Sequence, residues 1–159
     1  MNAVIIVHSY HHSSTRKIAD VMAKTLGAEV KTTTEITPEE AAGFELIGLG
    51  AGIDSGHHYK PLLDFAEALP KTTGQNTFLF STAGIAGKEK KKLNDHKALR
   101  VILQAKGYNV LSEFACKGFN TNSFLKHIGG MNKGCPTEDD LGNAAAFANG
   151  LKGGRHNGK

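Results

Sequence analysis

The chain has 159 residues, of which 40% are hydrophobic and 21% charged, and its formal net charge at pH 7 is +4. This length is typical of one domain that buries a core of its own. No apolar run approaches the roughly 18 residues of a membrane span, and no charged and then apolar leader follows Met1. We therefore expect one cytoplasmic domain over residues 1–152 that does not enter a membrane, and a mobile basic tail over residues 153–159.

The distribution of positive charge and the spacing of the cysteines argue against further classes of protein function. The basic excess lies mainly in residues 88–92 and in the tail. No aromatic residues alternate with the lysines of 88–92, so a solvated helix face accounts for them better than nucleic-acid binding does. Cys116 and Cys135 form no CxxC pair, which argues against a zinc site or a disulfide framework. We expect two reduced thiols that do not act as a redox pair.

The first segment combines a strand, a polar loop and a helix. Residues 3–7 are apolar and predict a strand, and apolar residues recur at helical spacing from residue 18 onward. A helix N-terminus offers unpaired N–H groups and a partial positive charge, which together favour an anion. The loop between them has no acidic residue and carries two histidines and four hydroxyl groups. These hydroxyl groups belong to Ser9, Ser13, Ser14 and Thr15.

These residues predict a phosphate site, although a single hydroxyl from Ser13 or Ser14 would suffice if the loop served only to cap the helix. The loop contains no glycine, so it matches neither a Walker A loop nor a dinucleotide-binding GxGxxG loop. We therefore expect a terminal monophosphate that is held by side-chain hydroxyl groups.

Strand and helix patterns then alternate to the end of the chain. Further strands are expected over residues 28–33, 45–50, 76–80 and 109–116. Helices are expected after the capping box at 37–40, over 62–69, from 88 to the glycine at 107, and from 136 to 151. This alternation predicts a five-stranded parallel sheet with helices on both faces and right-handed crossovers.

Ligands of such sheets bind outside the carboxyl ends of the strands. The loops after the first, third and fourth strands open at that edge, and all are rich in small or hydroxyl residues. The loop after the third strand contains Ala51, Gly52, Ile53, Asp54 and Ser55, and the loop after the fourth contains Ser81, Thr82, Ala83 and Gly84.

On these three loops, and on five strand and helix units over nearly the whole chain, the sequence resembles the flavodoxin family. The resemblance implies a three-layer α/β sandwich with strand order 2-1-3-4-5, bound FMN, and electron transfer to a redox partner protein of unknown identity. It implies no catalytic residue and no metal ligand. The residues that it assigns to FMN are Ser9, His11, Ser13, Ser14, Thr15, Ala51, Gly52, Ile53, Asp54, Ser81, Thr82, Ala83 and Gly84.

The chain departs from typical flavodoxins because it has no tryptophan and is basic rather than acidic. We expect a monomer or a weak homodimer. A second hypothesis is an NAD(P)H-dependent FMN reductase or quinone reductase, but no second nucleotide site is evident, which favours a carrier.

A metal site and a phosphoacceptor site would both be compatible with the same fold. A metal site could draw on the histidines that follow the first and third strands, which are His8, His11, His12, His57 and His58. A response-regulator receiver would use Asp54 as its phosphoacceptor, but it would also need acidic residues after the first strand, where His8 and Ser9 stand.

Overall fold

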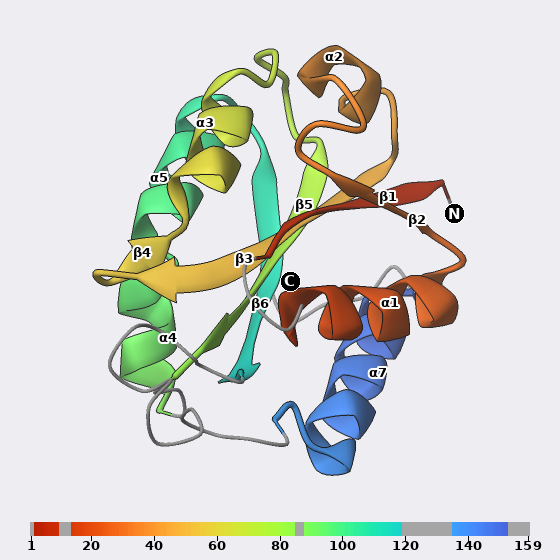
Figure 1. The fold of residues 1–159 in the computed structure, drawn as a ribbon. Coiled ribbons are helices and arrows are strands. Elements are labelled where there is room, and N and C mark those ends of the chain that lie inside the picture. The colour runs from red at the N-terminus through yellow and green to blue at the C-terminus, as the bar shows by residue number, and fades with distance from the viewer. Residues whose placement is uncertain (1, 10–13, 85–87, 119–134, 153–159) are drawn as a thin grey trace.

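The computed structural model describes residues 2–9, 14–84, 88–118 and 135–152. Its sheet has five parallel strands in the order β2-β1-β3-β5-β6, and a short strand, β4, pairs antiparallel with β3 (Figure 1). The strands are β1 (Ala3–His8), β2 (Glu29–Thr32), β3 (Leu46–Asp54), β4 (His57–His58), β5 (Asn76–Ala83) and β6 (Asn109–Lys117). Since β5 and β6 are the fourth and fifth predicted strands, the predicted order 2-1-3-4-5 is confirmed.

Helices cover both faces of this sheet and make a three-layer sandwich (Figure 1). The helices are α1 (Ser14–Leu26), α2 (Pro38–Ala41), α3 (Lys60–Glu67), α4 (Glu89–Asp95), α5 (Lys97–Ala105) and α7 (Glu138–Lys152). One apolar core lies between the sheet and α1 with α7, and a second lies between the sheet and α3 with α5. Within the described ranges, no helix is long and apolar enough to cross a membrane.

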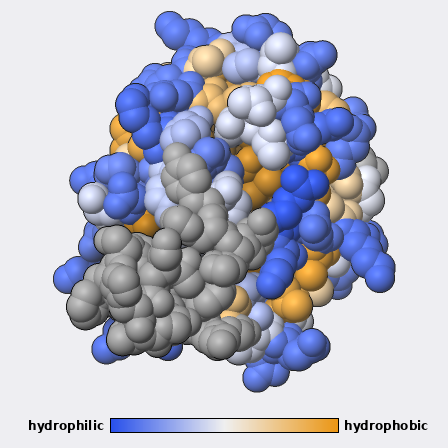
Figure 2. Space-filling view, viewed as in Figure 1, coloured by the Kyte–Doolittle hydropathy of each residue, from blue (hydrophilic) through white to orange (hydrophobic). Residues whose placement is uncertain are grey.

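The face of the molecule seen in Figure 2 is largely polar where its residues are described. Figure 2 shows that hydrophilic side chains cover much of the face that it presents, with hydrophobic ones exposed in smaller areas between them. Scattered apolar side chains of this kind are normal on a folded domain, because polar atoms alone cannot cover its surface.

Alternation along β1 builds both cores from one strand. Ile5 and Val7 belong to the core under α1 and α7, whereas Val4 and Ile6 belong to the core under α3 and α5. Successive side chains of a strand point to opposite faces, so a strand that is covered on both sides must be apolar throughout. This is why residues 3–7 form an unbroken apolar run.

The third and fourth predicted strands are longer in the structure than in the prediction. β3 continues through Asp54 and turns through Ser55 and Gly56, which have φ values of 54° and 83°, into β4. The prediction of an irregular loop over residues 51–54 is therefore wrong. β5 likewise continues to Ala83, because Gly52 of β3 pairs with Thr82 and extends the parallel ladder. Small and polar residues at these strand ends concealed their pairing in the sequence.

Two helix predictions also differ from the structure. The predicted helix after residue 88 is divided at His96, which has φ −90° and ψ −5° and lies between α4 and α5. Its imidazole is fully buried, so the bend carries a polar side chain into the core. The helix α1 begins at Ser14, four residues before the first residue of its apolar pattern, Ile18, and therefore includes Ser14 and Thr15.

Candidate functional site

The register of the parallel strands brings the three predicted loops together. His8 of β1 is paired with Ala51 of β3, Ala51 is paired with Ser81 of β5, and Gly52 is paired with Thr82. The carboxyl ends of β1, β3 and β5 therefore lie side by side at one edge of the sheet. The sequence-predicted residues His11 and Ser13 lie outside the described residues, so only part of the phosphate loop is placed.

The described part of that loop contains the first residues of α1. Ser14 and Thr15 are buried, and the first turn of this 13-residue helix has no acidic side chain. An anion at this end would meet backbone N–H groups of the first turn and the positive end of the helix dipole, with no carboxylate from that turn beside it. The donor set of this helix end therefore fits a phosphate group.

A hydrogen bond ties the start of α1 to the end of β5. The Oγ1 atoms of Thr15 and Thr82 lie 2.7 Å apart in a buried position. Gly118, which follows β6, packs so closely on this pair of elements that a Cβ there would lie 3.0 Å from Thr82 Cβ and 3.1 Å from Ser14 Cβ. Two of the predicted FMN-binding segments are thus held in a fixed mutual position by residues of the protein.

The hairpin of β3 and β4 forms the other side of the site. A Cβ on Gly52 would lie 2.7 Å from Tyr59 Cε2, so the absence of a side chain at Gly52 lets the phenol ring approach the strand. The Tyr59 ring also meets the imidazole of His8 edge-on, with 6.0 Å between ring centroids. Asp54 and Ser55 are exposed at the tip of the hairpin.

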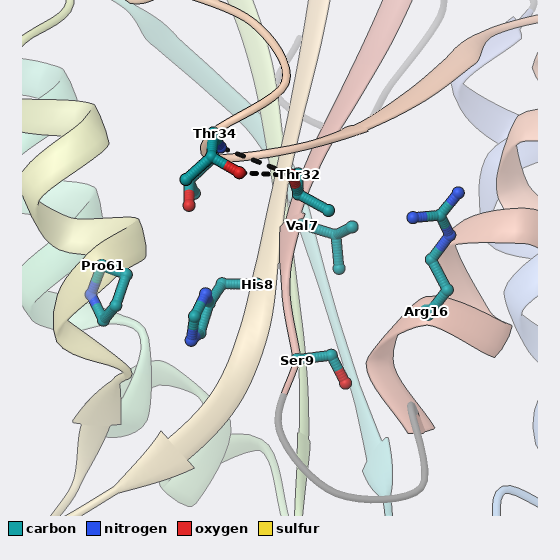
Figure 3. A pocket seen from close by; sticks show the side chains of 8 residues that line it. Val7, His8, Ser9, Arg16, Thr32, Thr34 and Pro61 are labelled. Carbon is teal, nitrogen blue, oxygen red and sulfur yellow. Dashed lines mark hydrogen bonds between the residues drawn. The ribbon is translucent and has the colours of Figure 1, made fainter.

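A pocket of about 470 Å³ lies beside Ser9 and the first turn of α1 (Figure 3). It is formed by the ends of β1 and β2 together with α1 and α3, and its lining residues are Val7, His8, Ser9, Arg16, Thr32, Thr33, Thr34 and Pro61. It lies on the β2 side of β1, whereas the two predicted ring-binding segments are at the ends of β3 and β5 on the other side. Burial lowers the pKa of His8 below its ordinary value, which favours a neutral imidazole at the pocket wall.

Sequence reasoning missed the pocket residues Arg16 and Thr32 to Thr34. The run of three threonines at the end of the second predicted strand was an available signal, because that strand ends at the same edge of the sheet as the first. A hydrogen bond of 3.2 Å links the Oγ1 atoms of Thr32 and Thr34 (Figure 3). Arg16 Nε donates a hydrogen bond to Asp20 Oδ1 at 3.3 Å.

A buried polar network lies under the carboxyl end of β5, on the α5 face of the sheet. Ser81 Oγ lies 2.7 Å from His96 Nε2, and His96 Nδ1 lies 2.9 Å from Glu113 Oε1 of β6. Arg100 of α5 donates to both Glu113 oxygens, from Nε at 2.7 Å and from a terminal nitrogen at 3.1 Å. The structure therefore directs the Ser81 hydroxyl to His96, whereas the neighbouring Thr82 hydroxyl faces Thr15.

The hydrogen bonds from His96 and Arg100 and the positive charge of Arg100 favour the ionised form of the Glu113 carboxyl group. Burial by itself raises the pKa of Glu113, but the hydrogen bonds from His96 and Arg100 and the charge of Arg100 outweigh it and lower that pKa to about 2. An ionised Glu113 accepts a hydrogen bond from His96 Nδ1, which leaves His96 Nε2 for the Ser81 hydroxyl. The sequence of serine, histidine and carboxylate matches that of a nucleophilic triad, but Ser81 is only 1% exposed and is not open to a substrate.

His58 packs against this network, with its ring tilted by 38° relative to that of His96. Its ring centroid is 4.7 Å from that of His96, and its Nε2 donates to the Phe80 carbonyl at 3.0 Å. Burial, reinforced by the charge of His96, lowers its pKa to about 3. His57 turns Nδ1 toward the His58 carbonyl at 2.8 Å. Within residues 2–9, 14–84, 88–118 and 135–152, no three His, Cys, Asp or Glu side chains gather as metal ligands would.

Both cysteines are free in the structure, Cys116 buried and Cys135 half-buried. Burial, with smaller effects of Asp140 and Cys135, raises the pKa of the Cys116 thiol to about 12. Cys116 is thus a protonated core side chain, and a thiol in that state is a poor nucleophile.

Comparison with known proteins agrees with this geometry. The flavodoxin domain profile matches residues 5–117, from β1 to the end of β6. The chain is 40% identical over 148 residues to the uncharacterized protein MJ0298 of Methanocaldococcus jannaschii, and the match covers 93% of this chain and 96% of that one.

Solved structures share the fold at low identity. The flavodoxin of Streptococcus pneumoniae TIGR4 has a TM-score of 0.72 at 16% identity, over 98% of this chain and all of that one. A flavodoxin from the domain Archaea has a TM-score of 0.65 at 12% identity, over 97% of this chain and 98% of that chain. Because the domain profile spans more than half of the sequence and the strand order agrees with it, the chain belongs to the flavodoxin family.

Proposed function

We propose that the protein binds FMN at the carboxyl edge of its sheet and serves as an electron carrier. The observation that carries this proposal is the hydroxyl-bearing N-terminus of α1, which the bond between Thr15 and Thr82 holds against the end of β5. Ser14 and Thr15 would face the phosphate, together with Ser9, His11 and Ser13. The ring would lie between residues 51–54 and residues 81–84. FMN, when bound, supplies the capacity to accept and give up one or two electrons.

The hairpin of β3 and β4 supports this assignment on the ring side. Tyr59 and Gly52 place an aromatic ring against the strand at this edge, and planar ligands pack well on aromatic side chains. Gly56, at φ 83°, gives the hairpin tip a conformation that other residues rarely adopt. The family relation supports a flavin as the ligand, and the loop without glycine favours FMN, which ends in a single phosphate.

The first experiment measures binding of FMN and of riboflavin by quenching of flavin fluorescence. Ser14→Ala should lower the affinity for FMN by about 10-fold to 100-fold, which is the equivalent of one charge-assisted hydrogen bond. It should leave the affinity for riboflavin nearly unchanged, because riboflavin has no phosphate. The control is Thr25→Val, which removes a hydroxyl group from the far end of α1, where Thr25 Oγ1 donates to the Val21 carbonyl.

Equal weakening of both flavins by Ser14→Ala would show that this helix end does not hold the phosphate. A protein that takes up neither flavin would overturn the proposal as a whole. Rapid oxidation of NADPH in the presence of a quinone would assign the FMN-loaded protein to the reductases instead of the carriers.

A further inference from the structure

Two exposed apolar side chains share one helix face. Leu93 on α4 and Val101 on α5 are 42% and 52% exposed, and they are the exposed large hydrophobic residues of the described part of the chain. His96 N donates to the Lys92 carbonyl at 3.0 Å and Arg100 N donates to the His96 carbonyl at 2.9 Å, so helical spacing continues across the junction of the two helices. Leu93 and Val101 are eight residues apart and therefore lie on one side of this bent helix.

Exposed lysines flank these apolar residues. Lys90 precedes Leu93 by three residues, and Lys97 lies between Leu93 and Val101, so all four share the face that we call the lysine–leucine face. The neighbouring lysines are engaged, since Lys91 pairs with Asp95, and Lys92 pairs with Glu89 at 3.0 Å. No described carboxylate lies within ion-pair distance of Lys90 or Lys97.

We propose that the lysine–leucine face docks an acidic surface of a small redox partner protein. This inference rests on the proposed function and adds the docking side and the charge of the partner. The face is well placed, because α4 begins five residues after Gly84, at the edge where β5 leaves the sheet. A partner seated on α4 would therefore lie beside the predicted FMN-binding segment 81–84.

The chemistry of the face suits a short-lived complex. Unpaired lysines attract an acidic surface from a distance and speed the encounter, whereas two aliphatic side chains give a small apolar centre that separates easily. Electron-transfer encounters are among the smallest specific interfaces, below about 1,200 Å² in total. A second copy of this chain is a poor occupant, because a two-fold contact centred on this face would bring lysines of the two copies together.

The test uses the FMN-loaded protein and two probes of opposite charge, a reduced acidic two-iron ferredoxin and an oxidised cationic cytochrome c. In the first reaction the ferredoxin loses one electron and the bound flavin gains it, and in the second the reduced flavin loses one electron and the cytochrome gains it. Stopped-flow absorbance gives both rates. The rate with the ferredoxin should fall as ionic strength rises, whereas the rate with the cytochrome should not.

Lys90→Glu with Lys97→Glu should slow the reaction with the ferredoxin about tenfold or more and remove most of its salt dependence. The matched control is Lys24→Glu with Lys71→Glu, which changes net charge equally at exposed positions on α1 and before β5. Leu93→Ser with Val101→Ser should slow the reaction several-fold without altering its salt dependence. Backbone amide shifts on adding oxidised ferredoxin should be largest within residues 90–101.

Three results would overturn the inference: equal effects of both lysine pairs, a rate with the cytochrome that falls as ionic strength rises while the rate with the ferredoxin does not, or amide shifts outside α4 and α5. Loss of self-association or of binding to anionic vesicles in the Lys90→Glu, Lys97→Glu variant would also overturn it, in favour of a second copy or a lipid surface. Flavin fluorescence decides the proposed function separately, since FMN can be retained whichever surface docks the partner.

Discussion

Thr15 and Thr82 show how much of the site depends on single side chains. They lie 67 residues apart in sequence, and each hydroxyl is the partner of the other in a buried position. A buried hydroxyl without a partner is unfavourable, because it has given up its hydrogen bonds to water. The same contact therefore stabilises the protein and holds the start of α1 against the end of β5.

Thr15→Val should lower the free energy of unfolding by about 1–3 kcal/mol, because it leaves the Thr82 hydroxyl buried without its partner. Thr82→Val should lower the free energy of unfolding by a similar amount, because it leaves the Thr15 hydroxyl buried without its partner. The double variant should lose less than the sum of the two, since no polar group is then left unpaired. Urea denaturation of the four proteins measures this coupling.

The control for these variants is Thr25→Val, whose hydroxyl bonds only within its own helix. Strictly additive losses at Thr15 and Thr82 would mean that the two hydroxyl groups do not depend on each other.

At the scale of elements, glycines decide how closely the strands of the sheet pack. A Cβ at Gly48 or Gly50 of β3 would overlap the Phe78 or Phe80 ring of the neighbouring strand β5. Both rings are fully buried beneath α1 and α7. The small residues of β3 thus serve the core, and they also make β3 resemble a loop in the sequence.

Gly50→Ala should lower the free energy of unfolding by about 1–3 kcal/mol, because the Phe80 ring must shift within a filled core. Gly142→Ala is the informative contrast. Gly142 lies in α7, and nothing stands within 4 Å of the Cβ that alanine would add. That substitution should raise stability by about 0.5–1 kcal/mol through the higher helix propensity of alanine.

Thermal or urea denaturation compares the two glycine variants directly. If both moved stability in the same direction, crowding by Phe80 would not be the reason for glycine at position 50.

At the scale of the molecule, buried ionisable groups link stability to pH. The pKa of Glu113 is about 2 in the folded protein, below its ordinary 4.5, so an unfolded chain takes up this proton first as pH falls. The pKa of His58 is about 3, below its ordinary 6.5, so the unfolded chain again binds more protons over that interval. By linkage, both groups make the folded state lose stability as pH falls from 6.5 toward 2.

Glu113→Gln should flatten the loss of stability between pH 4.5 and 2, and His58→Phe should flatten the loss between pH 6.5 and 3. At pH 7, Glu113→Gln should still be the less stable protein by several kcal/mol, since His96 and Arg100 lose an ionised partner. Urea denaturation at each pH unit from about 3 to 7 measures both effects. Glu67→Gln on the exposed side of α3 is the control, and a steep acid response that survives in both variants would place the responsible groups elsewhere.

The sequence by itself determined the architecture. Apolar strands, amphipathic helices and their punctuation by glycine and proline are local patterns, and five alternating units leave few topologies once right-handed crossovers are required. The strand order and the placement of the three predicted loops at one edge followed from these patterns and from the family resemblance. The assignment of FMN to individual residues remains a prediction.

Tertiary structure alone decided which side chains meet. Ser81, His96 and Glu113 come from β5, the bend between α4 and α5, and β6, and their spacing in sequence contains no sign of a shared hydrogen-bond chain. Their contact depends on the strand register, which shifts between Thr77 and Leu79 where β5 pairs with β6. The extension of β3 into a hairpin has the same origin, because small and polar residues become strand only when a neighbouring backbone satisfies their N–H and carbonyl groups.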